Sequence, residues 1–156
     1  MQVRAKQEDD QDWIGEVLAR HWGGSQIALG GRLVDACDLP ALIAGEREGL
    51  ATYLIAADGT TAELVTLNAL IERRGVGTAL IEDLTARFAA AGVRVLRVRM
   101  TNDNLDALRF YQRRGFRLAA LQPRRHRQGA QLKAVDPVDR ALRHSDPRSV
   151  RTGARD

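Results

Sequence analysis

Two glycines near the middle of the chain stand where a strand-like pattern passes into a helical one. Residues 63–69 are mostly apolar, and a charged turn then leads into the sequence RRGVGTAL. The first turn of a helix has unpaired N–H groups and the positive end of the helix dipole, so it attracts anions. Gly75 and Gly77 let backbone approach closely there, which predicts a site for a phosphate or pyrophosphate. A plain tight turn is the alternative, because the stretch has neither a Walker loop's Gly-Lys-Ser/Thr nor the three-glycine dinucleotide spacing.

The elements after this turn are predicted from hydrophobic periodicity. The helix that begins near Val76 has one apolar face, with charged residues opposite. A strand, VRVLRVRM, follows Gly92, and its apolar phase slips, which indicates a bulge or a strand buried on both faces. The segment TNDNLDALRFYQRRGF then predicts a short helix that is capped by Asn104, carries Tyr111 on its apolar face and ends at Gly115.

The N-terminal half predicts one helix and several antiparallel strands. The helix begins at Asp9 or Asp10 and ends at Gly23. Strands are expected at 3–6, 42–45 and 50–57, with 26–34 as a strand or extended loop. A two-residue hairpin turn is expected at Asp58 and Gly59. His21 is interpreted as a helix-end residue favoured by the dipole, and Cys37 as an inert thiol in a loop.

The order of strand, glycine turn, helix, strand and asparagine-capped short helix resembles the GNAT superfamily of acyl-CoA N-acyltransferases. The resemblance covers residues 63–121 closely and the N-terminal half loosely. It implies an α/β fold with a mixed, mainly antiparallel central sheet flanked by helices. It also implies acetyl-CoA as the acyl donor, a primary amine on a small molecule or peptide as the acceptor, and no metal.

The resemblance also implies which residues hold acetyl-CoA. The family loop has the form Arg/Gln-x-x-Gly-x-Gly/Ala and wraps the pyrophosphate. Glu72 occupies the Arg/Gln place here, where a carboxylate is electrostatically awkward, and its two arginine neighbours offset it. Asn104 matches the asparagine that hydrogen-bonds the pantetheine arm or its neighbours. The implied binding residues are Leu67 and Ala69 through their strand backbone, Arg73, Arg74, Gly75, Val76, Gly77 and Thr78 in the loop and first helical turn, and Asn104.

Two residues are candidates for proton transfer. In the family a tyrosine at the position of Tyr111 points at the thioester sulfur, and a phenol suits an alkyl thiolate as proton donor. The alternative is a core tyrosine that holds the helix to the sheet. Glu63, nine residues before Glu72, stands where some family members have a catalytic glutamate. A carboxylate with a pKa raised by burial can take the amine proton. A solvated strand end is the alternative for Glu63, and Glu46 is a competing base.

Composition excludes several classes of protein. With 156 residues the chain is long enough for one domain with a substantial core. No apolar run approaches the ~18 residues of a membrane span, and the first residues lack a secretory h-region, so the cytoplasm is expected. The positive charge is concentrated in residues 122–156, which hold nine Lys/Arg and four Asp and so have a net charge of +5. Because the whole chain has a net charge of +4, residues 1–121 have a net charge of −1. No aromatic stacking platform accompanies this positive charge, which argues against specific nucleic-acid binding.

The last 35 residues lack a sustained hydrophobic pattern. We therefore predict a domain at 1–121 and a disordered basic tail at 122–156, with the family's closing strand missing or altered. The strand at 116–121 would keep an uncovered edge that invites homodimerisation. Codons for residues 132–138 and 140–149 can be chosen so that a frame read one base later gives family-like segments. A frameshift near Pro123 is therefore our hypothesis, and an ordinary tail is the alternative.

The sequence thus predicts an N-acetyltransferase in which an amine attacks acetyl-CoA directly. Two other functions stay open at this point. One is a GNAT-like module that holds acyl-CoA without turnover, which Glu72 and the altered tail favour and Tyr111 opposes. The other is a nucleic-acid-binding protein that acts through the tail.

Overall fold

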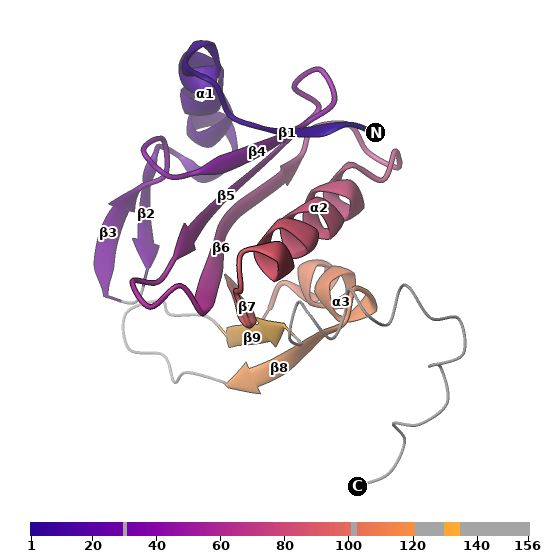
Figure 1. Cartoon of the computed structure of the whole chain (residues 1–156). Coiled ribbons are helices and arrows are strands. Elements are labelled where there is room, and N and C mark those ends of the chain that lie inside the picture. Colours follow the sequence, from indigo (N-terminus) through magenta and orange to yellow (C-terminus); the bar gives the residue numbers. More distant parts are fainter. Residues whose placement is uncertain (30, 101–102, 121–129, 135–156) are drawn as a thin grey trace, which may run out of the picture.

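The computed structural model describes residues 1–29, 31–100, 103–120 and 130–134 (Figure 1). The helices are a short 3-10 turn η1 (Glu8–Asp10), α1 (Gln11–Trp22), α2 (Val76–Ala90) and α3 (Leu105–Arg113). The strands are β1 (Val3–Ala5), β2 (Gln26–Leu29), β3 (Arg32–Asp35), β4 (Ala41–Ala44), β5 (Gly49–Ile55), β6 (Thr61–Ala69), β7 (Val95–Met100), β8 (Phe116–Ala120) and β9 (Ala130–Ala134).

The main sheet has the strand order β1-β4-β5-β6-β7-β9-β8, and β2 and β3 form a separate hairpin. Every pair in the main sheet is antiparallel except β6 with β7, which is parallel. Helices lie on both faces (Figure 1). The α2 and α3 face buries one apolar cluster, and the α1 and hairpin face buries a second. The predicted α/β class, with a mixed and mainly antiparallel sheet flanked by helices, is confirmed.

Apolar alternation along the strands divides the core between the two faces. Leu64 belongs to the cluster beneath α2, whereas its neighbour Val65 belongs to the cluster beneath α1. Leu42 and Ile43 are divided in the same way on β4. Neighbouring side chains of a strand point to opposite faces, so strands covered on both sides read as nearly continuous apolar runs.

Neither the bulge nor the burial on both faces that the sequence predicted for β7 is present, and the sheet has its bulge in β6 instead. Strand β7 pairs without a register shift with β6 and β9, and it is buried on one face only. Val93 lies before the strand and donates its N–H to Phe88, which explains the apparent phase slip. The irregularity falls between β5 and β6. Thr52 is opposite Thr66 and Tyr53 is opposite Leu64, so β6 contains one extra residue, Val65.

The hairpin turn at Asp58 and Gly59 is present but longer than predicted. Gly59 has a φ of 73°, and the Asp58 carboxylate accepts a hydrogen bond from the Thr60 N–H at 2.9 Å. Strand β5 ends at Ile55 and β6 begins at Thr61, so the loop has more residues than the two expected.

Part of the predicted tail is a strand. Residues 130–134 form β9, which pairs antiparallel with both β7 and β8. The expectation of a disordered tail is therefore wrong for these five residues. Strand β8 has β9 on one side and ends the strand order, so an edge for a second subunit stays a prediction. Residues 121–129 and 135–156 lie outside the described ranges, and the frameshift stays a hypothesis.

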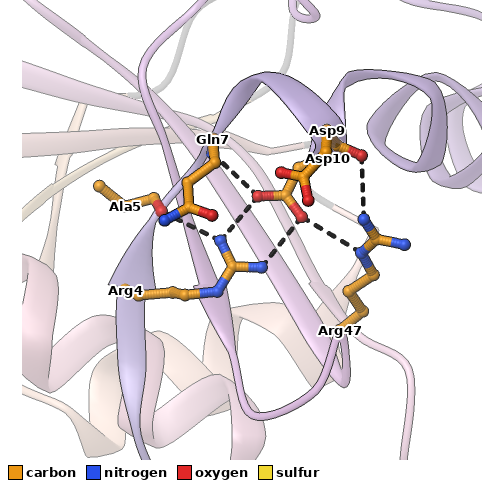
Figure 2. A network of polar contacts seen from close by, with 6 residues as sticks. All are labelled: Arg4, Ala5, Gln7, Asp9, Asp10 and Arg47. Atoms are coloured by element: carbon orange, nitrogen blue, oxygen red, sulfur yellow. Dashed lines mark hydrogen bonds and ion pairs between the residues drawn. The ribbon is translucent and has the colours of Figure 1, made fainter.

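A buried carboxylate joins the N-terminal elements to the turn between β4 and β5 (Figure 2). Asp10 is fully buried and accepts hydrogen bonds from both terminal nitrogens of Arg4, at 2.6 and 2.9 Å. It also accepts from Arg47 Nε at 3.2 Å and from the Gln7 backbone N–H at 2.9 Å. Hydrogen bonding from Arg4 holds the pKa of Asp10 well below its usual range, although burial opposes this. The network fixes the turn that lies next to the glycine loop.

Replacing Asp10 with Asn should destabilise the protein. The change leaves two arginines without their counter-charge, and loss of charge-assisted hydrogen bonds costs about 1.5–3 kcal/mol. The folded-state pKa of Asp10 is depressed, so its contribution is complete above about pH 4, the unfolded pKa, and declines as the pH falls below that. Urea unfolding at pH 7 and at pH 3 measures both effects. Asp9→Asn is the control, because Arg47 bonds the Asp9 backbone oxygen; equal midpoints for the two variants would contradict the network's role.

Candidate active site

Strand β6 leaves β7 halfway along its length. The two strands pair from Thr61 opposite Val95 to Leu64 opposite Val98. Strand β7 pairs with β9 along its other edge from Arg97 to Met100, while β6 runs on to Ala69 with β5 as its sole partner among the described residues. The β7-side edge of β6 past Leu64 is therefore open. An open strand edge offers backbone groups to an extended ligand. Leu67 and Ala69 lie on this segment, and their contact with a pantetheine arm stays a prediction.

The glycine loop leads from this open edge into α2. Gly75 is the N-cap residue with a φ of 72°, and no side chain in the described part of the chain caps the helix. Arg73 also has a positive φ, 59°, which is uncommon for a residue with a Cβ. A Cβ placed on Gly75 would meet no atom within 4 Å. The first N–H groups of α2 are therefore available to an anion.

Gly77 has a packing role that was not predicted, and its contact with a ligand stays a prediction. A Cβ at Gly77 would lie 3.0 and 3.2 Å from two ring carbons of Phe110 on α3. This glycine therefore permits close packing of the two helices. Gly49 is a similar position that sequence reasoning missed, because its Cβ would lie 2.3 Å from Val76 Cγ1. The Val76 side chain is buried against β5, which leaves only its backbone for a ligand.

A cation that sequence reasoning missed lies against the start of α2. Arg114, just after α3, donates from Nε to Thr78 Oγ1 at 3.1 Å and from Nη1 to the Phe110 carbonyl at 2.7 Å. Its Nη2 also contacts Thr78, and its guanidinium carbon is 3.5 Å from the Phe110 ring centroid. Thr78 therefore positions a guanidinium in addition to its predicted ligand role. The Arg-Gly-Phe sequence after α3 was the available signal.

Arg74 links the glycine loop to the turn between β4 and β5. Its Nη1 lies 3.2 Å from Glu48 Oε1, and its side chain is otherwise largely exposed. An open hollow lies on this side of the loop, away from the open edge of β6. Its lining is Met1, Gln2, Arg4, Gly45, Glu46, Arg47, Glu48 and Arg74. We assign this hollow no catalytic role, because its three arginines already pair with Asp10 and Glu48.

Glu63 is partly buried next to the point where β6 and β7 part. Its side chain is 17% exposed and contacts Arg99, which argues against the solvated-end alternative. Its Oε1 lies 2.8 Å from Arg99 Nε without the alignment of a hydrogen bond, and no other described atom bonds it. Burial raises the pKa of Glu63, and the nearby charges of Arg99, Arg97 and Arg32 lower it by less.

Glu46 is separated from this position. It lies in the turn before Gly49, whereas Glu63 is opposite Leu54 at the other end of β5. With a rise of ~3.3 Å per residue, five residues of strand place the two carboxylates roughly 17 Å apart. Glu46 also lines the hollow beside Arg74. Glu46 is therefore remote from the point where β6 and β7 part, and the role of Glu63 as the base stays a prediction.

Tyr111 and Asn104 lie on α3. The Tyr111 ring is 5.2 Å from that of Phe110 and 5.1 Å from that of Phe116, centroid to centroid, within the cluster beneath α2. Burial raises the pKa of its phenol, which keeps the hydroxyl protonated and makes it a weaker proton donor than a free phenol. Core packing of Tyr111 is thus present, and its role as an acid stays a prediction. Asn104 Oδ1 accepts from the Ala107 N–H at 3.2 Å, which confirms the helix cap.

Four further features of the described residues bear on other kinds of site. No three His, Cys, Asp or Glu residues gather there in a way that would hold a metal. Burial raises the pKa of the Cys37 thiol, so it is a poor nucleophile, as expected. None of the described helices is long and apolar enough to cross a membrane. Trp22, at the end of α1, donates to Asn68 Oδ1 at 2.9 Å and brings α1 against the open part of β6.

Comparison with known proteins agrees with this geometry. The family model for the acetyltransferase (GNAT) family matches residues 36–116. The protein YdhI of Bacillus subtilis (strain 168) is 32% identical over 128 residues, which cover 80% of this chain and 79% of YdhI. YxbD of the same organism is 30% identical over 115 residues, 71% of each chain.

A solved structure shows the same fold at low sequence identity. It is yncA, a putative acetyltransferase from Salmonella typhimurium with its cofactor acetyl-CoA. It superposes with a TM-score of 0.63 at 19% identity, over 86% of this chain and 91% of that one. Because the family model covers half of the chain and YdhI four-fifths of it, this chain belongs to the GNAT family of acetyltransferases.

Proposed function

We propose that the protein transfers the acetyl group of acetyl-CoA to a primary amine in the cytoplasm. One observation carries the proposal: the open edge of β6 runs directly into the uncapped N-terminus of α2. The edge suits the amide groups of a pantetheine arm, and the helix start suits its pyrophosphate. Arg114, Arg73 and Arg74 add positive charge that offsets Glu72.

The chemistry is a direct displacement at the thioester carbonyl. The amine nitrogen forms a bond to the carbonyl carbon, and the carbon–sulfur bond breaks. Glu63, with its raised pKa, takes the proton that the amine loses, directly or through a water. Tyr111, whose phenol is protonated before the reaction, supplies a proton to the departing thiolate. The net products are the acetylated amine and free CoA.

Acetyl-CoA should stabilise the fold, and Gly75→Ala should abolish that stabilisation. At a hundred-fold excess over the dissociation constant, ligand binding adds ~2.7 kcal/mol to the free energy of unfolding. The added methyl group has space in the protein but disfavours φ of 72° and stands where the pyrophosphate should bind. Thermal-shift measurements with and without acetyl-CoA show the stabilisation of the wild-type protein and its loss in Gly75→Ala.

The matched control is Gly59→Ala. Gly59 has nearly the same φ, 73°, and equally open surroundings, but it lies at the opposite end of β6. Both variants should lose similar stability, and Gly59→Ala should keep the acetyl-CoA shift. If the wild-type protein shows no shift with any acyl-CoA, the proposed donor site is wrong.

Glu63→Gln should remove the acidic limb of the pH–rate profile. A base works only when deprotonated, so the wild-type rate should fall as the pH drops through the raised pKa of Glu63. The glutamine variant should be slower at all pH values and nearly flat over this limb. Glu82→Gln, on the exposed side of α2, should leave the profile unchanged. Free thiol release measures the rates, and an intact limb in Glu63→Gln would exclude Glu63 as the base.

Tyr111→Phe should lower turnover by ~10²–10⁴ with little change in the acetyl-CoA shift. The phenylalanine keeps the ring contacts with Phe110 and Phe116 and removes only the hydroxyl. Turnover from thiol release and stability from thermal unfolding separate the two roles. A wild-type rate in the variant would assign Tyr111 to packing alone and leave water as the proton source.

A further inference from the structure

Glu63 belongs to a row of charged residues that crosses the C-terminal half of the sheet. It is opposite Arg97 on β7, Arg97 is opposite Lys133 on β9, and Lys133 is opposite Arg117 on β8. Residues directly opposite each other in neighbouring strands share one face of a sheet. Glu63 and Arg97 thus share one face of the sheet, and the next two register positions of this row are also basic residues in the sequence.

This row lies on the face of α1 and the β2–β3 hairpin. Leu96 and Val98 are buried in the cluster beneath α2, so Arg97 and Arg99 are on the other face of β7. The positive charge of Arg32, at the start of β3 in the hairpin, lowers the pKa of the Glu63 carboxyl. Arg32, Arg97 and Arg117 are all exposed. The approach to Glu63 from this face is therefore lined by arginines.

Positively charged groups outnumber negatively charged groups around Glu63. The charged groups that act on Glu63 are Arg99, Arg97 and Arg32, and all three are cations. Arg99 pairs with the carboxylate at 2.8 Å. Within the described ranges, the side chains of Arg97 and Arg32 form no hydrogen bond or ion pair. One carboxylate thus faces three guanidinium groups, which leaves an excess of positive charge where the acceptor amine must bind.

We propose that the acceptor amine carries an anionic group, a carboxylate or a phosphate, close to its nitrogen, and that Arg97 with Arg32 binds this group. The inference rests on the proposed function and names its substrate class. Guanidinium groups bind carboxylates and phosphates through paired charge-assisted hydrogen bonds. A polycationic acceptor is disfavoured by the same arginines, because like charges repel at short range.

Strand geometry limits the distance between the two groups of the acceptor. Neighbouring strands lie ~4.8 Å apart, and Glu63 and Arg97 are directly opposite each other. An amine held at Glu63 and an anion held at Arg97 are therefore separated by a few bonds. α-Amino acids and phosphoryl alkylamines meet this requirement, whereas an amine with a remote acid does not.

The test compares amines that differ in one anionic group. Tyrosine is matched with tyramine, and phosphoethanolamine with ethanolamine, and spermidine represents polycations. The wild-type protein with acetyl-CoA should show at least tenfold higher kcat/KM for the anionic member of one pair. The pair in which it does so distinguishes a carboxylate from a phosphate.

Arg97→Gln should then raise KM for that anionic amine by about ten- to a hundred-fold with little change in kcat, as expected for a lost charged hydrogen bond. The member without the anionic group should be almost unaffected, and Arg97→Lys should restore part of the preference. Arg109→Gln, an exposed arginine on α3 at the other face, is the control and should match the wild-type protein.

The outcomes separate this inference from the proposed function. Equal or better turnover of tyramine, ethanolamine or spermidine would overturn the anionic acceptor and leave acetyl transfer intact. An anionic preference that survives in a folded Arg97→Gln variant would overturn the assigned residue. Acetyl-CoA binding without thiol release for any amine would contradict the proposed function, and this inference with it.

Discussion

One extra residue in β6 determines how the site is built. Because Val65 has no partner on β5, Leu64 and Leu67 both face the cluster beneath α2, three residues apart. Val65 itself faces the other cluster. Thr52 and Thr66 close the irregularity with a buried hydroxyl pair at 2.6 Å. Pairing with β7 ends at the same point. A bulge bends its strand, so the open edge and the change of side-chain phase have one origin.

The start of α2 is held by its side chains and leaves its backbone exposed to a ligand. Val76 packs over Gly49, and Gly77 leaves space for the Phe110 ring. Thr78 accepts a hydrogen bond from Arg114. Each contact fixes the helix against a different neighbour, β5 in one case and α3 in the others. The proposed anion site would therefore consist of N–H groups and nearby cations. Such a site would depend weakly on the residue at the Arg/Gln place of the loop, so Glu72 is compatible with the proposal.

Local sequence predicted the elements whose signals are local. The glycine turn, the amphipathic α2 and the Asn104 cap follow from spacing and capping chemistry within a few residues. Strand β9 was missed because five residues carry little periodicity, and its pairing with β7 and β8 is supplied by distant segments. The bulge was misplaced for a similar reason. Val93 looked like part of a strand, and only the turn after α2 shows that it is not. Arg114 and Gly49 were missed because their partners are far away in sequence.

The two faces of the sheet divide the proposed reaction between them. The uncapped helix start, Arg114 and Tyr111 lie on the α2 and α3 side, whereas Glu63 and Arg97 lie on the α1 side. The open edge of β6 is the place where both sides meet. In the proposed reaction, a donor bound from one side and an amine bound from the other would meet at this edge. This arrangement favours direct attack over a covalent enzyme intermediate. Cys37, the single cysteine, is a weak nucleophile because burial raises the pKa of its thiol.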